Sequence, residues 1–139
     1  MGDRKNIIEI LEKASKKAMQ NAYAPYSSLK VGAAVLGVSG KVYTGCNVEN
    51  ASYGLTTCAE RTAILKAVSE GEKEIRAVAI ASSSGKPTFP CGACLQVIAE
   101  FAPTDGDMNI YLISDQKIES YTLAELLPHG FTFRGENHG

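Results

Sequence analysis

Arg76-Ala77-Val78-Ala79-Ile80-Ala81 is an almost unbroken apolar run near the middle of this 139-residue chain. Because apolar and polar residues do not alternate in it, the run predicts a strand that is buried on both faces. We expect a helix over 92–102, behind Pro90, and a second buried strand over 109–114. A strand, a helix and a strand in series predict two parallel strands joined by a right-handed crossover.

A second strand-helix-strand unit precedes the run at 76–81 and includes that run as its last strand. Strands over 31–38 and 41–46, separated by Ser39-Gly40, predict a hairpin, and a helix over 58–70 links this hairpin to the run at 76–81. The first helix, over 3–22, has one buried face. That face is formed by apolar residues at helical spacing: Ile7, Leu11, Ala14, Ala18 and Ala22, with Ile8 and Met19 beside them.

The last connection departs from this pattern. Asp115-Gln116-Lys117 is too short for a parallel crossover, so the strand over 118–121 is expected to return antiparallel. Thr122 and Glu125 predict a capping box at the start of a short helix over 122–127. The sequence thus predicts an α/β fold: a three-layer α/β/α sandwich whose five-stranded mixed sheet has an N-terminal hairpin, a parallel centre and an antiparallel last strand. We expect residues 1–139 to form a single domain.

Composition narrows the classes of function. Lys and Arg number 14 and Asp and Glu 15, a net charge of -1, so no excess of positive charge favours nucleic acid as a partner. No apolar run is long enough to span a bilayer and the N-terminal segment does not resemble a signal peptide, so we expect no membrane association and a cytoplasmic location.

Three of the four cysteines stand where helices are expected to begin. Cys58 opens one predicted helix, and Cys91 and Cys94 lie at the start of the next. Both positions follow strands at the same edge of the sheet, where α/β folds place their sites, and helix N-termini favour thiolates. Three thiolates on one tetrahedral Zn²⁺ leave the fourth position open, as in a catalytic site.

Two neighbours of Cys58 have the chemistry that such a site needs. Glu60, two residues after a ligand, is placed to take a proton from water at the open position and to pass it to a substrate. Three thiolates outweigh the charge of the metal by one unit, and Arg61 can offset this by donating a hydrogen bond to a ligand sulfur. Two other interpretations remain: a structural zinc held by all four cysteines, Cys46 included, and a redox Cys-x-x-Cys.

The motifs resemble those of the small, homotetrameric type of cytidine deaminase over nearly the whole chain. The resemblance implies one zinc ion per chain on Cys58, Cys91 and Cys94, with Glu60 as the proton shuttle. The residues that carry it are Ala24-Pro25-Tyr26-Ser27, Val31-Gly32-Ala33-Ala34, Gly45-Cys46-Asn47-Val48-Glu49-Asn50-Ala51, Cys58-Ala59-Glu60-Arg61-Thr62-Ala63, Pro90-Cys91-Gly92-Ala93-Cys94 and Glu125-Leu126-Leu127-Pro128.

The same resemblance implies where the substrate binds. Asn47 and Glu49 would hold the ribose hydroxyls, and two such residues on an extended segment point the same way. Ala59 is a further substrate-binding position. Phe131 and Tyr53 match positions near subunit contacts, where neighbouring subunits of a homotetramer complete each active site.

Two positions depart from the family pattern. Leu29 stands where many relatives have a Phe that packs against the pyrimidine, and Leu95 stands where many have an Arg that donates to a ligand thiolate. The first change widens the expected pocket. The second leaves Arg61 as the charge compensation for the thiolates.

We therefore expect zinc-dependent hydrolytic deamination of cytidine, deoxycytidine or both, a reaction of pyrimidine salvage. One alternative is deamination of a modified cytosine nucleoside such as blasticidin S, although Asn47-Val48-Glu49-Asn50-Ala51 follows the cytidine pattern. A polynucleotide editor is opposed by Cys58, where such enzymes usually have His, and by the short 115–117 turn. A zinc-stabilised binding module would leave Glu60 without a role.

Overall fold

The computed structural model describes residues 2–104 and 108–132. Its helices and strands lie close to the predicted ranges. In chain order they are α1 (Gly2–Met19), β1 (Val31–Gly37), β2 (Val42–Cys46), the 3₁₀ helix η1 (Tyr53–Leu55), α2 (Ala59–Ser69), β3 (Ile75–Ser82), α3 (Gly92–Glu100), β4 (Asn109–Ile113), β5 (Ile118–Thr122) and α4 (Leu123–Leu126).

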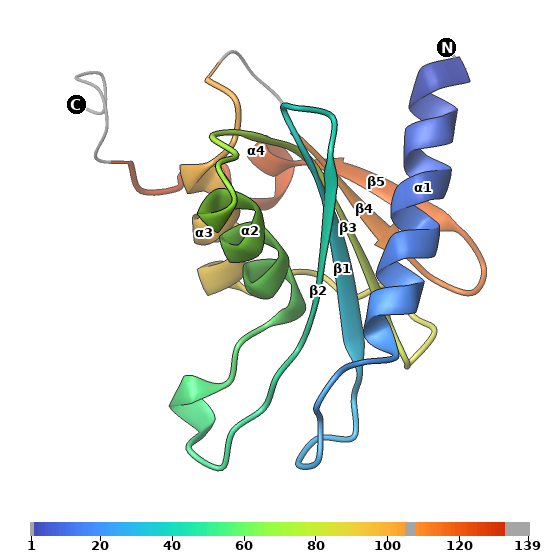
Figure 1. The fold of residues 1–139 in the computed structure, drawn as a ribbon, viewed down its shortest axis with the longest axis vertical. Coiled ribbons are helices and arrows are strands. Elements are labelled where there is room, and N and C mark those ends of the chain that lie inside the picture. Colours follow the sequence, from blue (N-terminus) through green and yellow to red (C-terminus); the bar gives the residue numbers. More distant parts are fainter. Residues whose placement is uncertain (1, 105–107, 133–139) are drawn as a thin grey trace.

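The five strands form one mixed sheet in the order β2-β1-β3-β4-β5. β1 is antiparallel to both β2 and β3, β3 is parallel to β4, and β5 returns antiparallel to β4. Helix α1 covers one face of the sheet, and α2 and α3 cover the other (Figure 1). The predicted three-layer sandwich is confirmed, including the hairpin, the parallel centre and the antiparallel last strand.

The central strand β3 shows why its sequence is uniformly apolar. Val78 and Ile80 point into the core beneath α2 and α3, whereas Ala77, Ala79 and Ala81 point toward α1. Both faces of β3 are therefore buried from solvent. The β3 side chains that face α1 are small, so α1 can lie close to the sheet.

The helix ends differ slightly from the predicted ones. Helix α1 ends at Met19 rather than at residue 22, and α3 ends at Glu100 rather than at residue 102. Ser15, a polar residue that the apolar pattern passes over, is fully buried in α1, where its hydroxyl donates to the carbonyl of Glu12. The capping box of α4 is confirmed, with Thr122 and Glu125 bonded reciprocally.

The strand directions bring three loops to one edge of the sheet. Because β1 is antiparallel to β2 and β3, those two strands point the same way and end beside each other's loops. The register places Gly32 opposite Cys46 and Val31 opposite Ser82, so the start of β1 lies at the same edge. The segments before β1, after β2 and after β3 therefore meet there.

Helix α2 lies directly on β2 at this edge. A Cβ atom at Gly45 would stand 2.5 Å from the amide nitrogen of Ala63 and 2.8 Å from the carbonyl oxygen of Ala59. No side chain larger than a hydrogen atom fits there.

In the part of the chain that the structure describes, no helix is both long and apolar enough to cross a bilayer.

Replacing Gly45 with alanine should therefore destabilise the fold. The added methyl group meets α2 backbone, which cannot move aside, and overpacking of this kind costs about 2 kcal/mol. Urea unfolding of Gly45→Ala, compared with Gly54→Ala, measures the effect, because an added Cβ at Gly54 meets nothing within 4 Å. Equal unfolding midpoints for the two variants would contradict the close approach of α2 to β2.

Candidate active site

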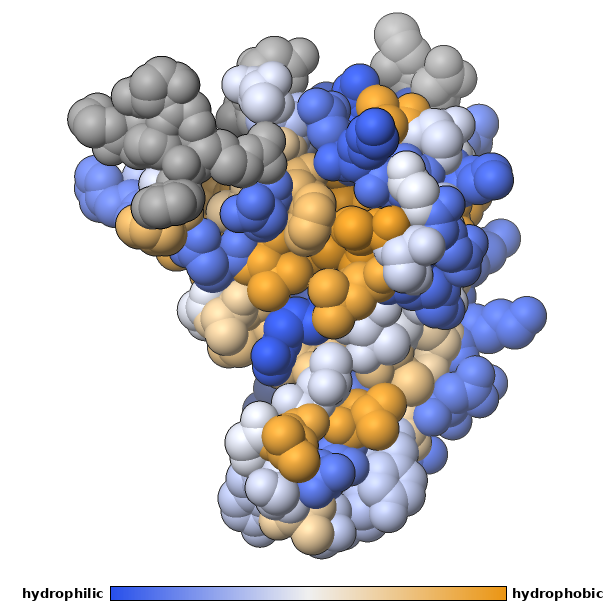
Figure 2. All heavy atoms as spheres, turned by 60° about the vertical axis from the view of Figure 1, so that its left-hand side comes forward, coloured by the Kyte–Doolittle hydropathy of each residue, from blue (hydrophilic) through white to orange (hydrophobic). Residues whose placement is uncertain are grey.

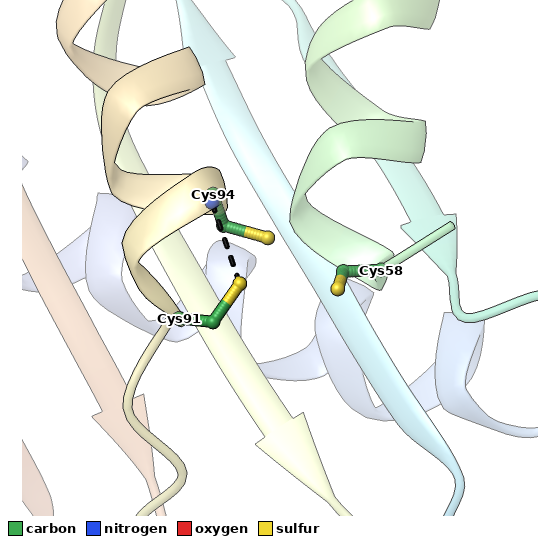
Figure 3. Close-up of side chains that lie close together, drawn as sticks. All are labelled: Cys58, Cys91 and Cys94. Atoms are coloured by element: carbon green, nitrogen blue, oxygen red, sulfur yellow. Dashed lines mark hydrogen bonds between the residues drawn. The ribbon is translucent and has the colours of Figure 1, made fainter. Parts of the chain in front are cut away.

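Three cysteine side chains converge where α2 and α3 begin. Cys58 is the N-cap residue of α2, Cys91 is the N-cap residue of α3, and Cys94 lies in the first turn of α3. Their sulfur atoms point toward one another from the two helices, and all lie within 4.8 Å of one another (Figure 3). The backbone N–H of Cys94 donates to the sulfur of Cys91 over 3.5 Å.

Cys46 does not belong to this group, although it ends β2 at the same edge of the sheet. The arrangement therefore does not support a closed site made by all four cysteines. It matches the predicted set of three, which leaves a position for a further ligand.

Arg61 supplies positive charge to the sulfur group. Its Nη2 atom donates to the sulfur of Cys58 over 3.3 Å. Hydrogen bonding with Cys94, together with the hydrogen bond and charge of Arg61, lowers the pKa of Cys58 to about 5. The hydrogen bond to Cys58, followed by burial, raises the pKa of Cys94, so binding of a metal ion must release the Cys94 proton.

The chemistry of this donor set fits zinc. Three sulfur ligands on two helix N-termini make a soft, anionic, partly buried cluster, and such clusters select Zn²⁺ over the oxygen-binding cations. Arg61 offsets the excess negative charge from one side. Its Nε atom is buried and, among the described residues, has no hydrogen-bond partner, so the guanidinium has donor capacity left at the site.

Glu60 lies beside the sulfur group in the first turn of α2. The residue is 5% exposed, and burial raises the pKa of its carboxyl to about 7. It lines a cavity of about 190 Å³ at the start of both helices. The other residues that line this cavity are Val31, Asn47, Thr56, Cys58, Ala59, Thr88, Phe89 and Cys91.

Asn47 and Glu49 both reach from the segment after β2 to the segment before β1. The Asn47 side chain accepts from Val31 N–H and donates to the carbonyl of Leu29, each over 2.9 Å. The Glu49 carboxylate accepts from the N–H of Tyr26 at 2.9 Å, from the N–H of Ser27 at 3.1 Å and from the Ser27 hydroxyl, and these bonds lower its pKa.

A second, wider cavity adjoins the first. It measures about 410 Å³ and is lined by Tyr26, Ser27, Glu49, Tyr53 and Thr56. Thr56 lines both cavities, so they are neighbours at the same edge. The rings of Tyr26 and Tyr53 meet edge to face with their centroids 6.1 Å apart.

Two residues implied by the resemblance lie outside these cavities within the described chain. Leu29 is partly exposed and does not line either cavity. Phe131 is 70% exposed beyond α4, where Gln96 bonds its backbone N–H and carbonyl. Sequence reasoning passed over Thr56 and Phe89, although each stands two residues before a ligand cysteine.

Comparison with known proteins places the chain in a family. The family model of the cytidine and deoxycytidylate deaminase zinc-binding region matches residues 5–107. The chain belongs to the cytidine and deoxycytidylate deaminase family. Because the family region binds zinc and Cys58, Cys91 and Cys94 are placed to hold a metal ion, the cofactor is Zn²⁺.

Relatives in this family resemble the chain over most of its length. A cytidine deaminase of Sporosarcina psychrophila is 49% identical over 126 residues, which cover 90% of this chain and 91% of that protein. A cytidine deaminase of Halalkalibacterium halodurans is 48% identical over 130 residues, which cover 93% of this chain and 97% of that protein. The crystal structure of a Burkholderia pseudomallei cytidine deaminase has a TM-score of 0.82 and 43% identity, covering 88% of this chain and 98% of that one.

Zinc content should depend on three of the four cysteines. Cys58→Ser, Cys91→Ser and Cys94→Ser each remove one thiolate, so purified variants should hold well under the one zinc ion per chain expected of the unaltered protein. Cys46→Ser is the control and should keep its zinc. Metal analysis by mass spectrometry makes the measurement, and loss of zinc from Cys46→Ser would contradict the assignment of the site.

Proposed function

We propose that this chain catalyses the hydrolytic deamination of cytidine, deoxycytidine or both, giving uridine or deoxyuridine and ammonia. The observation that carries the proposal is that Glu60 lines one small cavity together with Cys58 and Cys91. A buried carboxyl beside a site that fits zinc is the arrangement that hydrolytic deamination of a cytosine ring requires. The names of the relatives described above point to the same substrate class.

Cys58, Cys91 and Cys94 would hold the zinc ion, which when bound would act as a Lewis acid and lower the pKa of water, so that the water can lose a proton and attack C4 of the base. Glu60 takes the proton released from that water and gives it to N3 of the ring. It then takes the remaining proton of the added water, from the oxygen on C4, and passes it to the amino group at C4. The C4–N bond breaks, ammonia leaves, and the C4 oxygen becomes the carbonyl of the product.

The surroundings of Glu60 favour this proton transfer. Burial raises its pKa to about 7, so the carboxyl holds a proton more readily than an exposed Glu and can return it to the substrate. Ala59, which is fully buried and lines the same cavity, would bring its backbone close to the base. Arg61 would balance the thiolates, because Leu95 is packed into the core and carries no charge.

Asn47 and Glu49 would bind the sugar. Each already bonds to the 26–31 segment, yet each has capacity left: the Asn47 amide has a second hydrogen and a second lone pair, and the Glu49 carboxylate has further lone pairs. Glu49 and Tyr53 line the wider cavity, which adjoins the cavity of Glu60. The base would lie in the small cavity with the sugar beside it. Leu29, which lies in the 26–31 segment, would border the substrate.

We propose further that the active form is a homotetramer with shared active sites. Figure 2 shows apolar surface on the side of the molecule that carries α2 and α3. Leu65 on α2, Leu55 and Tyr53 in η1, and Phe131 beyond α4 are all exposed in the single chain. Burial of such side chains against neighbouring subunits is the favourable term that would drive assembly, with Tyr53 and Phe131 beside a neighbour's site.

The chemistry also suggests where the protein works. We assign it to pyrimidine salvage in the cytoplasm, acting on free nucleosides rather than on nucleic acid. All four cysteines are unpaired thiols, which suits a reducing compartment.

We treat residues 1–139 as one domain, because the described strands form a single sheet and the described helices pack against it.

Replacement of the Glu60 carboxyl should abolish turnover without loss of metal. In Glu60→Gln the amide cannot accept and return the proton, so kcat for cytidine, followed by ultraviolet absorbance, should fall by on the order of 1,000-fold or more. Zinc content and thermal stability should stay near those of the unaltered protein.

The matched control is Glu70→Gln, an exposed residue at the other end of α2 that should keep full activity. If the unaltered protein holds zinc but leaves cytidine and deoxycytidine intact, the proposed reaction is wrong. If Glu60→Gln is as active as Glu70→Gln, the role of Glu60 is wrong and the zinc site has another purpose.

A further inference from the structure

Phe89 is an aromatic side chain at the cavity of Glu60. It stands two residues before Cys91, in the loop between β3 and α3, and lines the cavity with Glu60, Cys58 and Cys91. Among the described residues that line this cavity it is the one aromatic. The residue is 51% exposed, so much of its ring is not covered by the chain itself.

The ring is held in place from one side. Its centroid lies 5.3 Å from that of Tyr121 on β5, with the two ring planes inclined at 54°. The Tyr121 hydroxyl donates to Glu119 over 2.7 Å, which fixes the supporting ring in turn. Pro90 restricts the backbone of Phe89 to extended conformations. The ring therefore has little freedom to lose when a ligand packs against it.

The other walls of the cavity offer no comparable surface. The lining otherwise presents small apolar or polar groups and the residues of the proposed chemistry: Val31, Asn47, Thr56, Ala59, Thr88, Cys58, Cys91 and Glu60. Leu29 does not line the cavity. Among the described residues of its own chain, a flat heterocycle that enters to reach Glu60 thus meets one aromatic surface, and aromatic rings gain from packing against each other in stacked or edge-to-face arrangements.

We propose that Phe89 is a specificity-determining residue that supplies the aromatic surface against which the pyrimidine ring of the substrate packs. The inference rests on the proposed function, because it identifies how the same site holds the base. Packing of this kind is similar in the bound substrate and in the transition state, so it should affect KM far more than kcat.

The test compares variants of Phe89 in zinc-loaded protein. Phe89→Leu keeps an apolar side chain against Tyr121 but removes the aromatic surface, whereas Phe89→Tyr keeps the ring. Loss of one stacked base contact corresponds to roughly tenfold weaker binding. KM for cytidine should therefore rise about tenfold in Phe89→Leu, with kcat within about twofold, and Phe89→Tyr should restore KM.

Ile10→Ala is the control for loss of an exposed apolar side chain. Ile10 is 53% exposed on α1, across the sheet from the site, and its variant should match the unaltered protein. Zinc content and melting temperature are measured for every variant. Binding of uridine, followed by calorimetry, gives the same comparison without turnover, and its Kd should rise about tenfold in Phe89→Leu.

Two results would overturn the inference. An unchanged KM and Kd in Phe89→Leu would show that the base does not pack on this ring. A fall in zinc content or melting temperature that accounts for the lost activity, with no rescue by Phe89→Tyr, would assign Phe89 to packing alone. Either result with an active unaltered protein leaves the proposed function standing, whereas an inactive unaltered protein overturns both.

Discussion

The site depends on bringing three sulfur atoms together from two helices that are far apart in the sequence. Cys58 and the Cys91–Cys94 pair begin α2 and α3, and each helix follows a strand that ends at the same edge of the sheet. The insertion of β1 between β2 and β3 keeps those strands pointing the same way, so both helices start at one edge. The absence of a side chain at Gly45 then lets α2, which Cys58 begins, lie directly on β2.

Convergence of this kind concentrates negative charge, and the surrounding structure compensates for it. The Cys58 sulfur accepts from Arg61, and the Cys91 sulfur accepts from a backbone N–H at the start of α3. Two helix N-termini add partial positive charge. On the open side, Asn47 and Glu49 tie the 26–31 segment to the end of β2. The two side chains that are proposed to bind the sugar therefore also shape the two cavities, because Asn47 lines the smaller one and Glu49 the wider one. Substrate binding is thereby coupled to the local fold.

Much of this could be predicted from the sequence, because the deciding signals are local. The apolar run at 76–81 required a strand buried on both faces, and the three-residue turn at 115–117 required β5 to return antiparallel. The remaining features depend on distant parts of the chain. The amide of Asn47 bonds to residues sixteen and eighteen positions earlier, and no pattern shows this. The place of Phe89 depends on a ring on β5, and a buried Ser15 breaks the apolar stripe from which the core face of α1 is predicted.

The proposed chemistry requires that three cysteines hold the zinc ion and leave its fourth position open. X-ray absorption at the zinc edge of the resting protein measures this arrangement, because sulfur and lighter ligand atoms scatter differently. We expect three sulfur atoms and one oxygen or nitrogen atom around each zinc ion. Four sulfur atoms would contradict this expectation, since a closed site that includes Cys46 is structural and leaves no place for water beside Glu60.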